Sequence, residues 1–171
     1  MSLTQAGQPT RRLLVVDDEP DILESLRDLL QAGLDHVTVE TAASGAQALE
    51  LLEHQHFALL VSDFKMPGMD GLELLRRAKD MAPKVPRVLM TAFPDLQIAI
   101  RAINEAAIEN FFTKPLDAEE VLNKTAAILD RRQAEMHRDR AFARAMELAS
   151  HGVHHDDDGA DENASSKGGA A

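Results

Sequence analysis

Short apolar runs alternate with segments of helical periodicity along the first 130 residues. One apolar run, 13–16, ends in acidic residues, and another, 57–62, ends at Asp63. Between the runs, apolar residues recur every three or four positions, which is the spacing of an amphipathic helix. Pro20 suits the first turn of a helix, and Ser44 suits an N-cap. The predicted strands are 12–16, 37–41, 57–61, 87–90 and 109–113. Helices are predicted at 20–33, 72–81 and 94–104. A further helix is predicted to follow Ser44 and run through residue 52, and a long one begins near residue 117.

This alternation predicts an α/β domain, in which helices cover both faces of an open parallel sheet. In such sheets, binding groups collect beyond the carboxyl ends of the strands. We therefore expect the polar residues at these ends to meet at one edge, and we expect the Asp63 carboxylate to be presented there rather than buried. The residues at strand ends are Asp17, Asp18, Asp63, Thr91 and Lys114.

Composition narrows the classes of function. The net charge is -11, and residues 1–130 contain 12 basic and 21 acidic groups, which disfavours nucleic acid as a direct partner. Tyr and Trp are absent, as is Cys, so thiol catalysis, disulfides and thiolate zinc sites are excluded. No apolar run approaches the roughly 18 to 20 residues that cross a bilayer. We expect a cytoplasmic protein with protein partners and no membrane contact.

Four motifs carry a resemblance to a known family. They are VVDDEP at the first strand end, SDFKMPGMDGLELL at the third, VLMTAF at the fourth and FFTKP at the fifth. Residues 11–130 thereby resemble the receiver domain of two-component response regulators, the CheY-like family. The resemblance implies a flavodoxin-like, doubly wound five-stranded parallel sheet in the order 2-1-3-4-5, with five helices of which the last is extended.

The resemblance also implies roles for single residues. Asp63 would be the phosphoacceptor, modified by a sensor histidine kinase or a phosphotransfer protein. Asp17 and Asp18 would complete a magnesium site with Asp63. Thr91 and Lys114 would contact the phosphoryl group, and Thr91 with Phe111 would form the switch that changes contacts with a downstream protein target. A cis peptide bond would precede Pro115. The domain would be a signalling switch and not a metabolic enzyme, with only self-catalysed phosphotransfer and autodephosphorylation.

Elementary chemistry supports the metal independently of the resemblance. Carboxylates held within a few ångströms repel one another, and this repulsion raises their pKa values unless a cation is present. A set of oxygen ligands without His or Cys selects a hard cation, and Mg²⁺ typically takes one or two carboxylates. The backbone carbonyl of Lys65 is a further candidate ligand.

Other interpretations of the same residues stay open. Asp17 and Asp18 are also suited to capping the first helix, and Asp63 alone is compatible with an ordinary turn. A non-signalling structural adaptor would keep the fold without using the phosphoacceptor. An aspartyl-phosphate phosphatase is the enzyme alternative, but it would need an Asp-x-Asp arrangement after the first strand, and this chain has Asp17-Asp18-Glu19.

Outside the domain, we expect a disordered leader at 1–10, a helical extension at 131–149 and a disordered acidic and Gly/Ser-rich tail at 150–171. Weak self-association is expected through the segments 94–104, 109–113 and the last helix, or through its extension. Phe93 is a candidate for hindering the hydrolytic water. The tail cluster of His151, His154 and His155 is more typical of a solvated segment than of a metal site.

Overall fold

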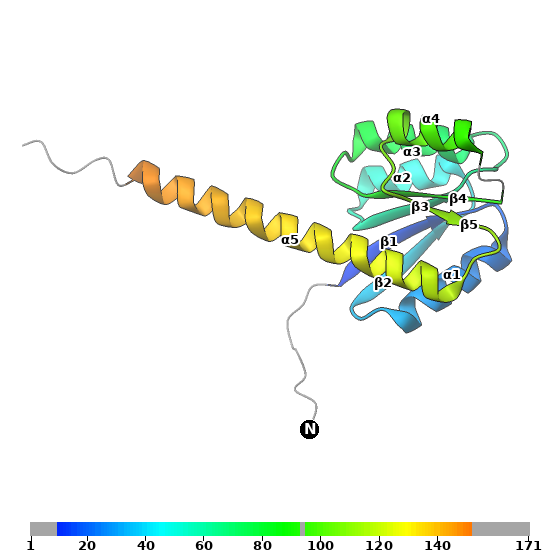
Figure 1. Cartoon of the computed structure of the whole chain (residues 1–171), viewed down its shortest axis with the longest axis horizontal. Helices are drawn as coiled ribbons and strands as arrows, with labels where there is room; N and C mark the ends of the chain where they lie inside the picture. Colours follow the sequence, from blue (N-terminus) through cyan, green and yellow to red (C-terminus); the bar gives the residue numbers. More distant parts are fainter. Residues whose placement is uncertain (1–9, 93–94, 152–171) are drawn as a thin grey trace, which may run out of the picture. The chain divides into compact units, whose positions relative to one another are not determined.

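The computed structural model describes residues 10–92 and 95–151, which contain a single five-stranded sheet and five helices (Figure 1). Every predicted strand and helix within this range is present. The elements are β1 Arg11–Val16, α1 Pro20–Gly33, β2 Val37–Ala42, α2 Gly45–His54, β3 Leu59–Asp63, α3 Gly71–Met81, β4 Arg87–Thr91, α4 Leu96–Ala106, β5 Asn110–Thr113 and α5 Ala118–His151.

All five strands are parallel, and their order is β2-β1-β3-β4-β5, as the family resemblance predicted. One difference from prediction concerns β3, which begins at Leu59 instead of Phe57. Leu59 is the first residue that stands in register with β1, opposite Leu13. Phe57 precedes the strand and packs into the core with 6% of its surface exposed. Apolar content alone therefore misplaced the start of the strand by two residues.

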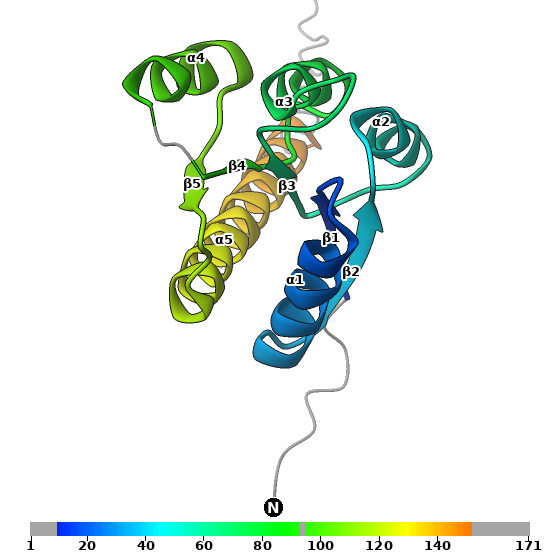
Figure 2. The same ribbon diagram turned by 90° about the vertical axis from the view of Figure 1, so that its right-hand side faces the viewer.

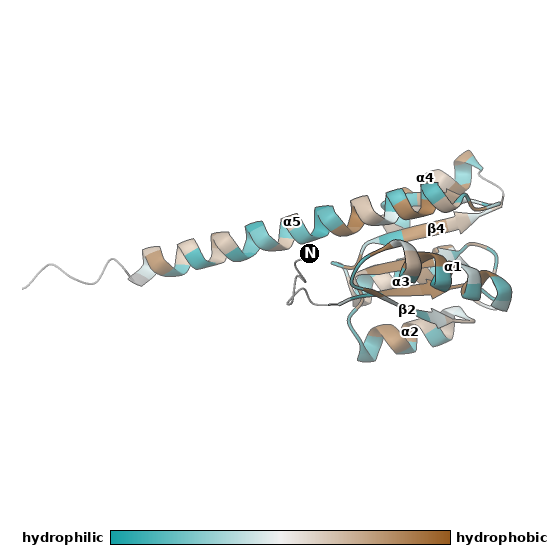
Figure 3. Ribbon diagram, turned by 90° about the horizontal axis from the view of Figure 1, so that it is seen from below, coloured by the Kyte–Doolittle hydropathy of each residue, from teal (hydrophilic) through white to brown (hydrophobic). Residues whose placement is uncertain are grey.

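Two hydrophobic layers enclose the sheet, one on each face (Figure 2). Helices α2, α3 and α4 cover one face, and α1 with the first turns of α5 covers the other. The strands between them are mainly hydrophobic, whereas the outer helix surfaces are mixed (Figure 3). Burial on both faces is typical of parallel sheets and explains why the strands read as continuous apolar runs.

Local chemistry fixes where the helices begin. The Ser44 hydroxyl accepts a hydrogen bond from the backbone N–H of Gln47 at 3.2 Å, as an N-cap does. Asp70 caps α3 and Asp95 caps α4 in the same way. Helix α1 instead starts with Pro20, and no side chain caps it. The capping role considered for Asp17 and Asp18 is therefore not what the structure shows.

The chain divides into two compact units, one up to Gln133 and one from Ala134. Helix α5 has 34 residues and includes the segment 131–149 that was predicted to be a helical extension. Within the second unit, large apolar side chains are exposed, among them Phe142 at 69% and Leu148 at 68%. Across the residues described, none of the helices combines the length and apolarity that crossing a bilayer demands. Residues 1–9 of the predicted leader and 152–171 of the predicted tail, with His154 and His155, lie outside the described residues.

Candidate functional site

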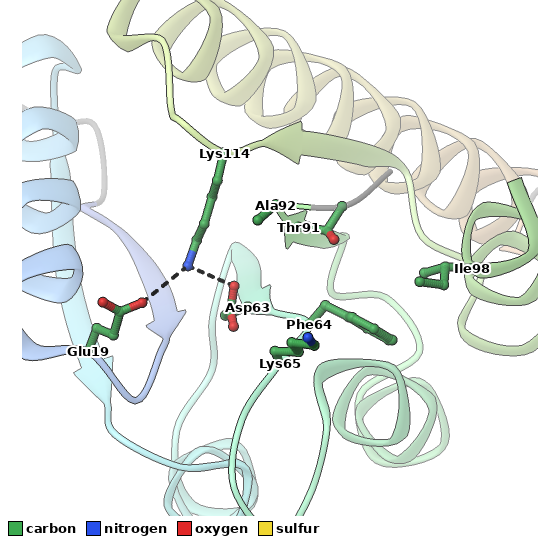
Figure 4. A pocket seen from close by; sticks show the side chains of 8 residues that line it. All are labelled: Glu19, Asp63, Phe64, Lys65, Thr91, Ala92, Ile98 and Lys114. Carbon is green, nitrogen blue, oxygen red and sulfur yellow. Dashed lines mark ion pairs between the residues drawn. The ribbon is translucent and has the colours of Figure 1, made fainter. Parts of the chain in front are cut away.

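The carboxyl ends of the parallel strands bring the predicted polar residues to one edge of the sheet. Asp17 directly follows β1, Asp63 ends β3, Thr91 ends β4 and Lys114 directly follows β5. A cavity of about 300 Å³ opens at this edge (Figure 4). It is lined by Glu19, Asp63, Phe64, Lys65, Thr91, Ala92, Ile98 and Lys114.

Three carboxylates form the acidic part of the site. One oxygen from each of Asp17, Asp18 and Asp63 lies within 4.8 Å of the others. Asp17 is fully buried and Asp63 is 5% exposed, whereas Asp18 is exposed. The Oδ1 atom of Asp17 accepts a hydrogen bond from the backbone N–H of Glu19 at 2.9 Å, which holds this carboxylate inward. The donor set is all oxygen, so it fits a hard divalent cation.

The burial of Asp63 corrects our expectation that its carboxylate would be presented to solvent. Asp63 is not beyond the end of β3 but is its last residue, and it stands in register with Met90 of β4. Neighbouring strand ends and the loop after β3 therefore surround it. The side chain lines the cavity, and 8% of the side-chain surface is exposed.

Lys114 is a cation in direct contact with the acidic residues of the site. Its Nζ atom lies 2.8 Å from Asp63 Oδ1 and 2.9 Å from Asp17 Oδ2, and 4.0 Å from Glu19 Oε1. Figure 4 shows the lysine extending from the end of β5 between Glu19 and Asp63. The peptide bond between Lys114 and Pro115 is cis, as the resemblance implied.

One ammonium group does not balance the acids around it. Burial raises the pKa of Asp63, and repulsion from Asp17 adds to this, while the hydrogen bond from Lys114 only partly opposes the rise. Burial by itself lowers the pKa of Lys114, but its hydrogen bonds to Asp63 and Asp17 dominate and raise it. The lysine thus stays charged, and the pocket holds an excess of negative charge that a divalent cation would relieve.

The loop after β3 fixes the backbone of Asp63. The Ser62 hydroxyl donates to the Asp63 carbonyl at 2.9 Å, and the Gly71 N–H donates to the Phe64 carbonyl at 2.8 Å. A Cβ atom on Gly71 would lie 1.9 Å from the Asp63 carbonyl oxygen, so only glycine permits this close approach. The main chain at Asp63 is therefore held on both sides by hydrogen bonds.

The remaining predicted residues occupy different places. Thr91 is 2% exposed and lines the cavity, and its backbone carbonyl accepts the N–H of Lys114 at 2.9 Å. The backbone N–H of Lys65 donates to the Asp63 carboxylate. Phe111 does not line the cavity but is half-buried against the layer of α2, α3 and α4. Phe93 lies outside the described residues.

Three lining residues were missed as site residues. Glu19 belongs to the VVDDEP motif, so its acidity next to the strand end was a usable signal. Phe64 directly follows Asp63 in the third motif, and this position was a usable signal as well, whereas apolar Ile98 is indistinguishable in sequence from a core residue. Ile98 comes from α4 and lies across the pocket from Glu19 in Figure 4.

Comparison with known proteins identifies the family of this domain. A family profile described as the response regulator receiver domain matches residues 13–126. The chain belongs to this family. A crystal structure of a signal receiver domain from an HD domain-containing protein of Pseudomonas fluorescens Pf-5 is 34% identical to the chain, with a TM-score of 0.69, and covers 73% of this chain and 98% of that one.

Curated relatives of this receiver domain include longer regulators. The C4-dicarboxylate transport transcriptional regulatory protein DctD of Rhizobium meliloti is 32% identical over 141 residues, which are 82% of this chain and 30% of DctD. The DNA-binding transcriptional regulator NtrC of Escherichia coli K12 is 41% identical over 109 residues, which are 63% of this chain and 22% of NtrC. The chain thus spans less than a third of the length of either relative.

Proposed function

We propose that this receiver domain accepts a phosphoryl group on Asp63 in a Mg²⁺-dependent reaction, and that the modification changes its contacts with a protein partner. The observation that carries the proposal is the convergence of Asp17, Asp18 and Asp63 within 4.8 Å, next to the ammonium group of Lys114. The raised pKa of Asp63 supports the presence of a cation, because the lysine alone leaves the carboxylates unbalanced.

The proposed reaction is a displacement at phosphorus. An Asp63 carboxylate oxygen attacks the phosphorus atom of a phosphohistidine on a histidine kinase or phosphotransfer protein. A P–O bond forms while the P–N bond breaks, and the electron pair of the broken bond stays on the imidazole nitrogen. The product is an acyl phosphate on Asp63, and its hydrolysis by water returns the carboxylate and inorganic phosphate.

The residues of the pocket supply position and charge for this reaction. The three carboxylates would hold the cation, with the Lys65 carbonyl as a further ligand, and bound Mg²⁺ supplies positive charge to the transferring oxygens. Lys114 lies 2.8 Å from Asp63 Oδ1 and would contact a phosphoryl oxygen there. The Thr91 hydroxyl would donate to another, and the small Ala92 leaves room in the 300 Å³ cavity.

Switching would begin with Thr91 and end at the surface of α4, β5 and α5. When Thr91 turns to the phosphoryl group, it vacates space that the ring of Phe111 can enter. Phe111 packs against the layer to which α4 belongs, so a turn of this ring alters the support of that helix. Three aliphatic side chains of α4 are exposed and suit a protein partner or weak self-association, namely Leu96 at 74%, Ile100 at 47% and Ile103 at 56%.

The test is incubation with a small phosphodonor and Mg²⁺, followed by intact mass measurement. We expect one phosphoryl group per chain, none after chelation of the metal and none in Asp63→Asn. Asp80→Asn removes an exposed carboxylate from the end of α3 and serves as the matched control, which should be phosphorylated like wild type. Stoichiometric labelling of Asp63→Asn would refute the proposal.

Two alternatives predict other results in the same assay. A phosphatase would turn over a small phosphate ester without needing Asp63; its nucleophile would have to be Asp17 or Asp18, and Asp17 is fully buried and bonded to Lys114. A structural adaptor would bind its partner equally well with and without the phosphodonor. Sedimentation with and without beryllofluoride adds a second readout, because an unchanged profile together with unchanged partner binding would favour the adaptor.

A further inference from the structure

Helix α4 is held unevenly along its length. Its buried residues are Ala102 and Ala106, both in the second half of the helix and both fully buried. Its first residue, Leu96, is 74% exposed, and residues 96–101 include no fully buried side chain. Apolar burial therefore secures the carboxyl-terminal half of α4 much better than the amino-terminal half.

A buried arginine adds to this asymmetry. Arg87, the first residue of β4, is 4% exposed. Its Nε atom donates to the Ala106 carbonyl at 2.8 Å and its Nη2 atom donates to the Ala107 carbonyl at 3.3 Å. The same guanidinium donates to the Val85 carbonyl at 2.6 Å. One planar group thus joins the end of α4 to the turn before β4.

The carbonyls that receive these donors are those a helix cannot satisfy by itself. The Glu105 carbonyl, one residue earlier, accepts from Lys79 Nζ of α3 at 3.1 Å. Cationic donors at the carboxyl end of a helix also complement the negative end of its dipole. Three consecutive carbonyls, of Glu105, Ala106 and Ala107, are therefore bonded to cations of neighbouring elements.

Arg87 keeps its charge although its surroundings disfavour it. Burial lowers the pKa of Arg87, and the nearby Arg132 lowers it further, but an arginine remains protonated throughout the range in which proteins fold. Glu109 pairs with Arg132 at 2.5 Å and offsets part of the local positive charge. The anchor is consequently permanent and does not depend on pH.

The loosely held half of α4 faces the acidic pocket. Asp95 caps the helix by accepting the N–H of Gln97 at 2.7 Å. One residue further, Ile98 lines the cavity together with Asp63 and Thr91. The end of α4 next to Asp63 is thus held by the Asp95 cap and by half-buried Ile98, which packs against the core, whereas the distant end has two fully buried alanines and is bonded to Arg87.

We propose that Arg87 is a positioning residue that pins the carboxyl-terminal end of α4, so that phosphorylation moves the amino-terminal turns of this helix about a fixed end. The inference rests on the proposed function for the input at Asp63. Beyond the proposed function, the inference states that the amino-terminal part of α4 responds to phosphorylation and that Arg87 holds the carboxyl-terminal part in place. A partner that recognises the modified domain would then be sensitive to the region of Leu96 and Ile100 more than to the end of the helix.

The first test is backbone amide hydrogen exchange of the full chain, resolved by NMR, with and without Mg²⁺ and beryllofluoride. Without the additives, amides 104–106 should exchange at least about tenfold more slowly than amides 99–101, all of which are inside the helix. With them, exchange at 99–101 should change severalfold and exchange at 104–106 by less than about twofold. Equal changes in both halves would overturn the proposal.

The second test is Arg87→Lys, which keeps the charge but loses the planar fork of donors. We expect the change on activation to spread to amides 104–106, while the rate of phosphoryl incorporation at Asp63 stays within about twofold of wild type. The matched control is Arg77→Lys, at an exposed arginine that pairs with Glu73 one turn earlier. It should behave like wild type.

A merely structural role of Arg87 gives a different result. The unfolding stability of Arg87→Lys would then fall while the activation change stayed confined to 99–101, and this outcome contradicts the proposal. If mass measurement shows no phosphoryl group on wild-type Asp63, the proposed function fails instead. In that case the exchange rates without additives still test the role of the arginine. Slower exchange of amides 104–106 than of amides 99–101 in wild type, and loss of this difference in Arg87→Lys, would show that Arg87 pins the helix.

Discussion

The buried charged side chains at the two ends of the parallel sheet are paired in different ways. At the carboxyl end, Asp17 and Asp63 are buried and both contact the ammonium group of Lys114, with exposed Asp18 beside them. At the amino end, Arg87 is buried among backbone carbonyls, and the carboxylate of Glu109 pairs with the arginines at 131 and 132. At the first end the buried carboxylates outnumber the ammonium group that contacts them, whereas at the second end the buried guanidinium group of Arg87 is hydrogen-bonded to backbone carbonyls.

We interpret the carboxyl end of the sheet as a ligand site and the amino end as a structural support. A buried charge that is fully hydrogen-bonded costs little to keep and holds elements in place. A cluster of like charges with too few counter-charges costs stability until a ligand arrives. The cavity of about 300 Å³ opens at the unbalanced end, where a cation and a phosphoryl group would complete the set.

The largest expected effect is the loss in the free energy of unfolding when one cation is removed from either end of the sheet. Arg87→Met leaves several buried carbonyls without donors, so we expect a loss of about 3 kcal/mol in the free energy of unfolding. Lys114→Met leaves two buried carboxylates unpaired and should cost about 2 kcal/mol without metal, since the lysine is partly exposed. Urea unfolding followed by circular dichroism measures both, because the chain has neither Tyr nor Trp.

Magnesium should distinguish these two variants. Saturating Mg²⁺ replaces the missing positive charge in Lys114→Met and restores a large part of its stability, but it leaves the deficit of Arg87→Met unchanged. Equal recovery of both variants would mean that the two ends do not differ in the way we describe.

The next largest effect on stability is expected from substituting one of two glycines. Gly71→Ala puts a Cβ atom 1.9 Å from the Asp63 carbonyl oxygen, which is backbone and cannot move aside, so we expect a cost of about 2 to 3 kcal/mol and slower phosphorylation. Gly33→Ala meets Leu122 Cδ2 at 2.5 Å, the flexible end of a side chain, and should cost clearly less. Similar costs for both would show that the Asp63 loop yields more easily than its hydrogen bonds indicate.

A smaller effect is expected from magnesium on the wild-type domain. At ten times its dissociation constant, a cation bound only by the folded state adds about 1.4 kcal/mol to the free energy of unfolding. Asp18→Asn should remove most of this gain without metal-free destabilisation, because Asp18 is exposed. Thermal melts with and without Mg²⁺ check this, and Asp80→Asn, which should keep the full gain, is the control.

The smallest effect concerns pH in the presence of a chelator. The folded-state pKa of Asp63 is raised above its unfolded value of 3.8, so its contribution to stability is present at low pH and is lost as pH rises through the folded pKa. Asp63→Asn lacks this loss. The stability of the variant relative to wild type should therefore increase as pH rises from the unfolded value of 3.8 through the raised folded-state pKa of Asp63. A flat difference would contradict the raised pKa, and Asp80→Asn should give a flat line.

Much of the site was accessible from sequence because strand ends are marked by residue type. An apolar run that stops at Asp17, Asp63 or Lys114 identifies both the strand and the side chain beyond it. Exposure was predicted wrongly for Asp63, since burial depends on the strands on either side. Ile98 could not be found at all, because an apolar residue on a helix carries no sign of which helix end approaches a pocket.

The sequence by itself determined the α/β alternation, the parallel sheet and the set of polar residues at its carboxyl edge, because apolar periodicity and turn chemistry are local properties. Only the tertiary structure decided which carboxylates are buried, how Lys114 divides its bonds between Asp17 and Asp63, and that Arg87 reaches the end of α4. These features depend on distances between segments far apart in the chain, and such distances exist only once the sheet and its two helical layers have packed together.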